Sequence, residues 1–321
     1  MLRRHILPLG FSLTLFLMLM LNAADAAEAA RAALTVCAKT LIPSLFPFFV
    51  LSSLLNSFGL SVFLGKLLGG FAARLYGISG AGASALVLGL CGGYPSGAAY
   101  LGQMEQSGAI SAEEGERLLT FCNNSGPAFV IGAIGLGAFH SAKIGAFLYA
   151  VHVLSALLTG LFFRGIPACD VPYSGRLDES SPALAFSDAV KRSAISLLSI
   201  SGFVVFFSTL LAVLDARGAV SLFCGFLHEG FGWPLTYARA LCTGLLELGS
   251  AAALLEGIAP SPASLALAAG LLSWGGLSVH FQTLSVLAES KITGALHLTG
   301  RLVSAGFAAF TAYVFARLLW F

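Results

Sequence analysis

Long apolar stretches dominate the chain, and four of them run without an obvious break. Crossing the hydrocarbon core of a bilayer takes about 20 consecutive apolar residues in a helix. Four stretches meet this length, namely Leu41–Leu60, Ile144–Phe163, Ser193–Leu214 and Leu296–Leu319. The pattern predicts that each forms a regular membrane-spanning helix.

Four further apolar stretches are interrupted by glycine, proline or polar side chains. They are Ala81–Leu101, Leu118–Phe139, Leu241–Leu255 and Leu265–Leu287. Backbone groups at membrane depth must be hydrogen-bonded, so such breaks are tolerated only where protein or a water-filled cavity surrounds them. We therefore expect these stretches to form broken helices or re-entrant hairpins around a cavity.

The uninterrupted and interrupted stretches occur in the same order in both halves of the chain: one uninterrupted, two interrupted, one uninterrupted. A displacement of about 154 residues lays Cys122 to Phe129 on Gly276 to Thr283. Paired interruptions in two halves of a chain are typical of transporters built from internal repeats, with the binding site at the breaks. The predicted fold is an all-α polytopic membrane protein with two repeats, residues 41–163 and 193–321, joined by a polar loop at 164–192.

The first 40 residues precede this pattern. Arg3-Arg4-His5 and the apolar run Ile6 to Leu21 resemble a secretory signal. Because the rest of the chain is polytopic, we interpret the run as a retained transmembrane helix with a cytoplasmic amino end. Asp25 to Lys39, rich in alanine with spaced charges, predicts an amphipathic helix at the membrane interface.

The basic residues indicate how the chain is threaded. If every stretch crosses, they divide eight against eight between the two sides, contrary to the positive-inside rule. If the stretches around Gly92 and Glu247 are hairpins that return to the same side, ten lie in the cytoplasm and six outside. Each repeat then crosses three times, so the two repeats are inverted relative to each other.

The amino-acid composition excludes several classes of function. Hydrophobic residues make up 57% of the chain and charged residues 10%, too few to cover a soluble protein. The net charge of +2 offers no basic field for nucleic acid. No P-loop, HExxH or GxSxG motif and no metal spacing of cysteines is present, so we expect neither an enzyme nor a cofactor. The predicted partners are the lipid bilayer, a small solute and Na⁺ or H⁺ as a coupling ion.

The first repeat carries six candidate solute-binding residues at its two breaks. Gly93, Tyr94 and Ser96 lie where a helix restarts, and its amide donors would suit an anion. Asn123, Asn124 and Ser125 precede Pro127 and are costly in hydrocarbon unless they bind a solute, an ion or one another. A packing kink at Gly93 and interhelical hydrogen bonds at Asn123 are the alternatives.

The second repeat adds polar residues of its own. His280 and Gln282 are candidates for solute binding. They face the same cavity only if the chain after the Gly275-Gly276 break is extended, because on a regular helix they lie about 200° apart. Alternatively, His280 is a buried side chain that only forms a hydrogen bond within the protein. Glu247 can bind Na⁺, carry a proton, or pair with Arg239 or Arg301. Arg301 itself can meet a solute carboxylate or extend to the membrane surface. The acidic run that follows Ser111 predicts a solvated helix face.

Four motifs in this order resemble the YlbJ family of sporulation integral membrane proteins, also called stage V sporulation protein V. They are Pro43-Ser44-Leu45-Phe46-Pro47-Phe48, Gly93-Tyr94-Pro95-Ser96-Gly97, Phe121-Cys122-Asn123-Asn124-Ser125-Gly126-Pro127 and Gly275-Gly276-Leu277-Ser278-Val279-His280-Phe281-Gln282. Members contain the nucleoside-recognition, or Gate, domain that concentrative nucleoside transporters share. The resemblance implies that the two repeats are Gate-like.

The resemblance also implies a function. Such a protein would lie in the inner membrane of a spore-forming bacterium, or in the outer forespore membrane, and export dipicolinic acid from the mother cell. Dipicolinate is a flat aromatic dianion that half-helix amino ends, the polar residues above and stacking on Tyr94 would hold. Two alternatives stay open: an ion-coupled nucleoside transporter with Glu247 as the coupling residue, and a membrane scaffold for spore cortex assembly that docks through residues 164–192.

Overall fold

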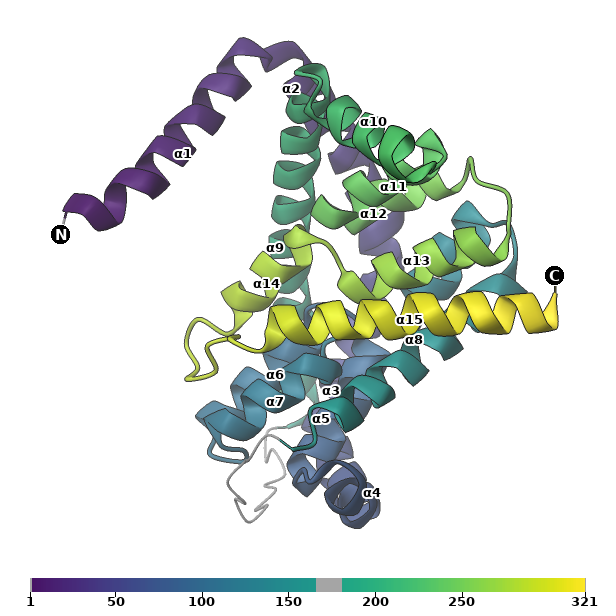
Figure 1. The fold of residues 1–321 in the computed structure, drawn as a ribbon. Coiled ribbons are helices and arrows are strands. Elements are labelled where there is room, and N and C mark those ends of the chain that lie inside the picture. The colour runs from purple at the N-terminus through teal and green to yellow at the C-terminus, as the bar shows by residue number, and fades with distance from the viewer. Residues whose placement is uncertain (1, 166–180, 321) are drawn as a thin grey trace.

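The computed structural model describes residues 2–165 and 181–320, and every regular element in these ranges is helical (Figure 1). The first half contains α1 (Leu2–Leu21), α2 (Ala23–Val36), the π-helical η1 (Cys37–Leu41), α3 (Ile42–Ser57), α4 (Leu60–Tyr76), α5 (Gly80–Gly92), α6 (Ser96–Gln106), α7 (Ala112–Cys122), the π-helical η2 (Ala128–Ala138) and α8 (Ala142–Phe162). The second half contains α9 (Pro182–Ala216), α10 (Ala219–Phe231), α11 (Leu235–Leu246), α12 (Leu248–Leu255), α13 (Pro262–Trp274), α14 (Leu277–Val286) and α15 (His297–Leu319). In the described part, four helical stretches are long and apolar enough to cross a membrane, or up to six if each bent pair is one span.

The same order of elements occurs in both halves. A helical hairpin (α5–α6 and α11–α12) precedes a broken helix (α7–η2 and α13–α14), and a long helix (α8 and α15) follows. The corresponding helices α5 and α11 begin at Gly80 and Leu235, close to the displacement expected from the sequence. The predicted hairpins and broken helices are therefore present in both repeats.

The corresponding helices α8 and α15 run in opposite directions. Helices α4 and α10 lie at opposite ends of the molecule (Figure 1). The ammonium of Lys143, at the start of α8, lies 5.3 Å from the ring centroid of Trp320, just after α15. Phe162, at the end of α8, meets Phe307 in the first half of α15. This antiparallel pairing is the arrangement that inverted repeats require.

The stretch predicted as an interfacial helix is part of a longer helical stretch in the structure. α2 continues through η1 into α3, so one helical stretch runs from Ala23 to Ser57. Its buried positions include Ala33, Cys37 and Leu41, which pack in one cluster with Leu197 and Ile200 of α9. Part of this stretch thus packs against α9, while Leu34 and Val36 of α2 are exposed.

Helix α9 begins earlier than the sequence suggested. Ser181 is its N-cap and accepts a hydrogen bond from the amide of Leu184 at 3.4 Å, with Pro182 in the first turn. Residues 182–192, expected in the connecting loop, are therefore helical. Residues 166–180 of that loop lie outside the described residues.

The acidic run after Ser111 is not the solvated face that the sequence predicted. Glu114 is 1% exposed and accepts from the amide of Ser79 at 2.6 Å. Glu116 accepts from the hydroxyl of Thr293 at 2.6 Å and the amide of Gly294 at 2.9 Å. Backbone donors in loops need acceptors, and these carboxylates supply them. Glu116 thereby joins the first repeat to the loop before α15.

Replacing Glu116 by alanine should loosen this loop. Leaving the donors of Thr293 and Gly294 without their acceptor costs on the order of 1–2 kcal/mol, so the open loop becomes about tenfold more populated. Trypsin should then cut the detergent-solubilised protein after the exposed Lys291 about tenfold faster. Glu113→Ala, at an exposed acid of the same helix, is the control. Equal cleavage rates in the Glu116 variant and the parent protein would contradict the role assigned to this carboxylate.

Candidate solute-binding site

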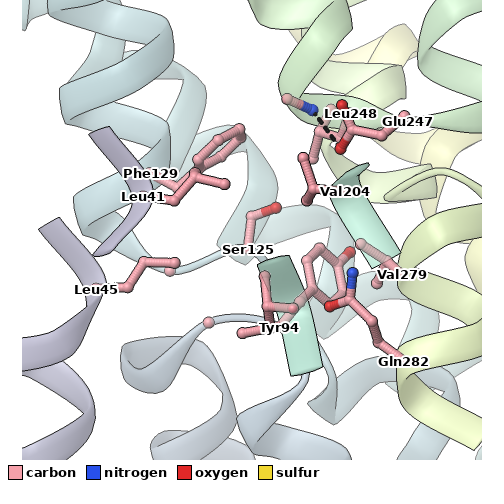
Figure 2. Close-up of a pocket in the computed structure, with 14 residues that line it drawn as sticks. Leu41, Leu45, Tyr94, Ser125, Phe129, Val204, Glu247, Leu248, Val279 and Gln282 are labelled. Atoms are coloured by element: carbon pink, nitrogen blue, oxygen red, sulfur yellow. Dashed lines mark hydrogen bonds between the residues drawn. The ribbon is translucent and has the colours of Figure 1, made fainter. Parts of the chain in front are cut away.

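Both hairpins and both helix breaks meet at one central cavity (Figure 2). The cavity volume is about 60 Å³. The first repeat contributes Gly93 and Tyr94 from the α5–α6 turn, and Ser125 and Gly126 from the break between α7 and η2. The second repeat contributes Glu247, Leu248 and Gly249 from the α11–α12 turn, and Val279 and Gln282 from α14. Corresponding parts of the inverted repeats thus face the same space.

The walls of this cavity differ in polarity. Leu41 and Leu45 in the stretch η1–α3, Phe129 of η2 and Val204 of α9 form an apolar side. The phenol of Tyr94, the hydroxyl of Ser125, the amide of Gln282 and the carboxylate of Glu247 supply the polar groups, as the labelled side chains in Figure 2 show. A mostly apolar cavity with a few convergent polar groups is the usual form of a small-molecule site.

Glu247 caps a helix instead of forming an ion pair. Its carboxylate accepts from the amides of Gly249 at 2.9 Å and Ser250 at 2.5 Å, at the amino end of α12. The two basic partners expected from the sequence are engaged elsewhere, since Arg239 pairs with Asp215 and Arg301 binds carbonyl groups. Glu247 is 3% exposed and lines the cavity, so its carboxylate has access to a cation or proton there.

Arg301 neither lines the cavity nor extends to the membrane surface. It is fully buried and donates to the backbone carbonyl oxygens of Asn123 at 2.7 Å and Thr120 at 2.9 Å, and to the phenol oxygen of Tyr94 at 2.9 Å. The last carbonyl groups of a helix have no intrahelical partner and carry partial negative charge. A guanidinium from α15 thus caps the broken end of α7 and holds Tyr94 in place.

Asn123 and Asn124 bind protein groups, which is the interhelical alternative left open by the sequence. Asn123 donates to the hydroxyl of Thr283 at 2.8 Å and accepts from the amide of Ala98 at 3.3 Å, so it connects hairpin α5–α6 with α14. Asn124 donates to the carbonyl of Phe121 at 2.6 Å. The third residue of the motif, Ser125, does face the cavity and donates to a carbonyl of α13 at 3.2 Å.

His280 and Gln282 point to different surroundings because α14 is a regular helix from Leu277 onward. Two residues apart on a helix, they lie about 200° from each other. Gln282 lines the cavity, whereas the Nδ1 atom of His280 lies 3.1 Å from Nε2 of His297, behind the cavity wall. Ser96 also lies outside the central cavity, and its hydroxyl donates to the carbonyl of Gly92 at 3.3 Å.

A curated relative identifies the family. The chain is 31% identical over 318 residues to the sporulation integral membrane protein YlbJ of Bacillus subtilis (strain 168), a match that covers 91% of this chain and 77% of the relative. This chain belongs to the YlbJ family. It is accordingly a multi-pass integral membrane protein. No protein-family model matches the sequence.

The fold of this YlbJ-family chain is similar to that of the solved protein CNTnw. A double variant of the concentrative nucleoside transporter CNTnw in an outward-facing state superposes with a TM-score of 0.61 at 15% identity, covering 97% of this chain and 84% of that one. CNTnw in an inward-facing, substrate-bound state gives a TM-score of 0.58 at 13% identity, covering 85% and 73%. At these identities the likeness establishes the fold.

Sequence reasoning missed a histidine that holds the two breaks of this YlbJ-family chain together. His152 of α8 is fully buried, accepts from the amide of Ser125 at 3.0 Å and lies 2.8 Å from the hydroxyl of Ser273 at the end of α13. A polar residue in an otherwise apolar span was a usable signal. Helix α9 also contributes Ile200 and Val204 to the cavity. No signal in the sequence could have indicated this, since both residues are ordinary apolar positions in a long helix.

Proposed function

We propose that this YlbJ-family protein carries a small polar or anionic solute across the membrane, and that the solute is dipicolinate leaving the mother cell during sporulation. The observation that carries the proposal is the convergence of two hairpin turns and two helix breaks, one pair from each inverted repeat, on one cavity. Alternating access around a fixed site is how inverted-repeat transporters work. The family membership supports the sporulation context.

The residues that line the cavity suit a flat solute with polar groups at its edge. Leu45, Phe129 and Val204 offer apolar contact to ring faces. Tyr94 offers an aromatic ring for stacking, while Ser125 and Gln282 offer polar groups to carboxylate oxygens. This division matches dipicolinate, whose two carboxylates flank the ring nitrogen.

Glu247 makes the proposal more specific. An ionised carboxylate and a dianion in one cavity repel each other in a medium of low dielectric constant. Glu247 must then be neutralised by a proton or by Na⁺ while the solute is bound. We therefore include ion coupling through Glu247 in the proposed mechanism, and the cavity-facing position of this carboxylate supports it.

Reconstituted protein should take up labelled dipicolinate saturably, at a rate that depends on either pH or Na⁺. Glu247→Gln removes the titratable group and keeps one acceptor oxygen, so it should lose the ion dependence and one of the two hydrogen bonds to the α12 amides. Glu256→Gln, at an exposed acid at the end of the same hairpin, is the matched control and should behave as the parent.

The same liposomes test the rival solute. The fold likeness to CNTnw favours a nucleoside as the second candidate, and labelled uridine is its probe. Saturable uridine uptake without dipicolinate uptake would select the nucleoside transporter. Absence of saturable uptake of both solutes by the parent protein would overturn the transport proposal.

A further inference from the structure

A second cavity, with a more polar lining than the central one, lies on the other side of the hairpin turn that borders the central cavity. It is bordered by α3, α6 and α9, is open on one side, and has a volume of about 100 Å³. We name it the α3–α6–α9 vestibule. Polar side chains reach it from all three helices, namely Ser53, Ser57, Ser96, Gln103, Ser193 and Ser196. So many hydroxyl groups on facing helix sides are unusual in a chain that is 57% hydrophobic.

One charged side chain lines the vestibule, and it is basic. Arg192 of α9 borders the space, and none of the other lining residues carries a charge. In the described part of the chain, Arg192 forms no ion pair with a carboxylate. The vestibule therefore favours negative charge and offers hydroxyl donors to bind it.

The vestibule and the central cavity are neighbours along the chain. Gly93 and Tyr94 line the central cavity, and Ser96 lines the vestibule, so a single turn of the α5–α6 hairpin separates them. The charges on the two sides are opposite, with Glu247 in the central cavity and Arg192 in the vestibule. An anion is thus attracted to the vestibule first and meets a carboxylate only beyond the hairpin turn.

We propose that the α3–α6–α9 vestibule is an anion-binding site that captures a carboxylate of the solute before it passes the hairpin. The inference rests on the transport function proposed above and assigns the solute class as anionic. Arg192 presents a fork of N–H donors to a carboxylate, and the serine hydroxyls satisfy its remaining lone pairs. In the orientation predicted from the basic residues, Arg192 faces the cytoplasm, the side from which an exporter loads.

The test compares uptake by the parent protein with uptake by variants at Arg192 and at the neighbouring Lys191. Arg192→Gln should raise the half-saturating concentration of labelled dipicolinate about tenfold when dipicolinate is offered on the vestibule side, because one charge interaction is lost. Arg192→Lys keeps the charge without the fork, so it should fall between the parent and the glutamine variant. Lys191→Gln removes a neighbouring exposed charge that does not line the vestibule and should leave the value unchanged.

Two further measurements separate a charge effect from a general one. The difference between Arg192→Gln and the parent should shrink at high ionic strength, since Arg192 is exposed. Pyridine-2,6-dicarboxamide has the same shape as dipicolinate without its charge. The parent protein and Arg192→Gln should therefore take it up with the same half-saturating concentration. Dipicolinate uptake by Arg192→Gln with an unchanged half-saturating concentration would overturn the vestibule site while transport stands. Failure of the parent to take up any solute would overturn the proposed function itself.

Discussion

Replacing Arg301 by glutamine is expected to lower the melting temperature of the solubilised protein by on the order of 5–10 °C and to abolish solute uptake. The guanidinium satisfies the buried carbonyl groups of Thr120 and Asn123. Each buried acceptor left unsatisfied costs about 1–3 kcal/mol. Glutamine is too short to reach both carbonyls from α15. Loss of the bond to Tyr94 also frees the side chain that lines the central cavity.

Two variants make this prediction specific. Arg317→Gln removes an exposed arginine from the same helix and should leave the melting temperature unchanged. Arg301→Lys keeps the charge but loses the planar fork, so it should lie between the parent and Arg301→Gln in stability. An Arg301→Gln protein as stable as the parent would show that the α7 carbonyl groups find other partners.

Replacing Gly89 by alanine should prevent recovery of folded protein from the membrane. A Cβ atom at this position would lie 1.8 Å from the carbonyl oxygen of Cys122, at the end of α7. The same oxygen would lie 2.4 Å from a Cβ atom at Gly97, so it sits between the two arms of hairpin α5–α6. The obstacle is backbone on both sides, and it cannot move aside as a flexible side chain would.

The control for Gly89 is a glycine in a helix with open space around it. Gly202 of α9 has no atom within 4 Å of a built Cβ, so Gly202→Ala should be recovered like the parent. Fluorescence-detected size-exclusion chromatography of tagged variants measures the folded fraction directly. A monodisperse Gly89→Ala protein at the parental level would contradict the close approach of hairpin and broken helix.

Much of the fold followed from the sequence because the bilayer imposes simple requirements. An apolar run of sufficient length must be helical, and a run that contains Gly92-Gly93-Tyr94-Pro95 or Asn123-Asn124-Ser125-Gly126-Pro127 must break. The recurrence of such breaks at one displacement predicted two repeats, and the structure has the same hairpin, broken helix and long helix in each. The distribution of basic residues indicated inversion, in agreement with the antiparallel pairing of α8 and α15.

The sequence was less informative where a side chain could bind either protein or solute. Asn123 and His280 carry the same polar groups as residues that face the cavity, yet their partners are Thr283 and His297. Each of these partners lies on another helix, and the position of that helix in the fold cannot be predicted from the residues around the polar side chain. The acids Glu114 and Glu116 were misjudged for the same reason, since their donors lie in loops far along the chain.

The sequence by itself determined that this is a membrane protein of two inverted, interrupted repeats, because hydrocarbon penalises every exposed backbone group and so marks each break. Only the tertiary structure decided which polar groups at those breaks face a cavity. Gln282 and His280 are two residues apart, and a regular helix sends one to the cavity and the other behind it. Likewise, Arg301 serves the end of α7 because the two repeats pack against each other, a contact between segments 178 residues apart in the chain.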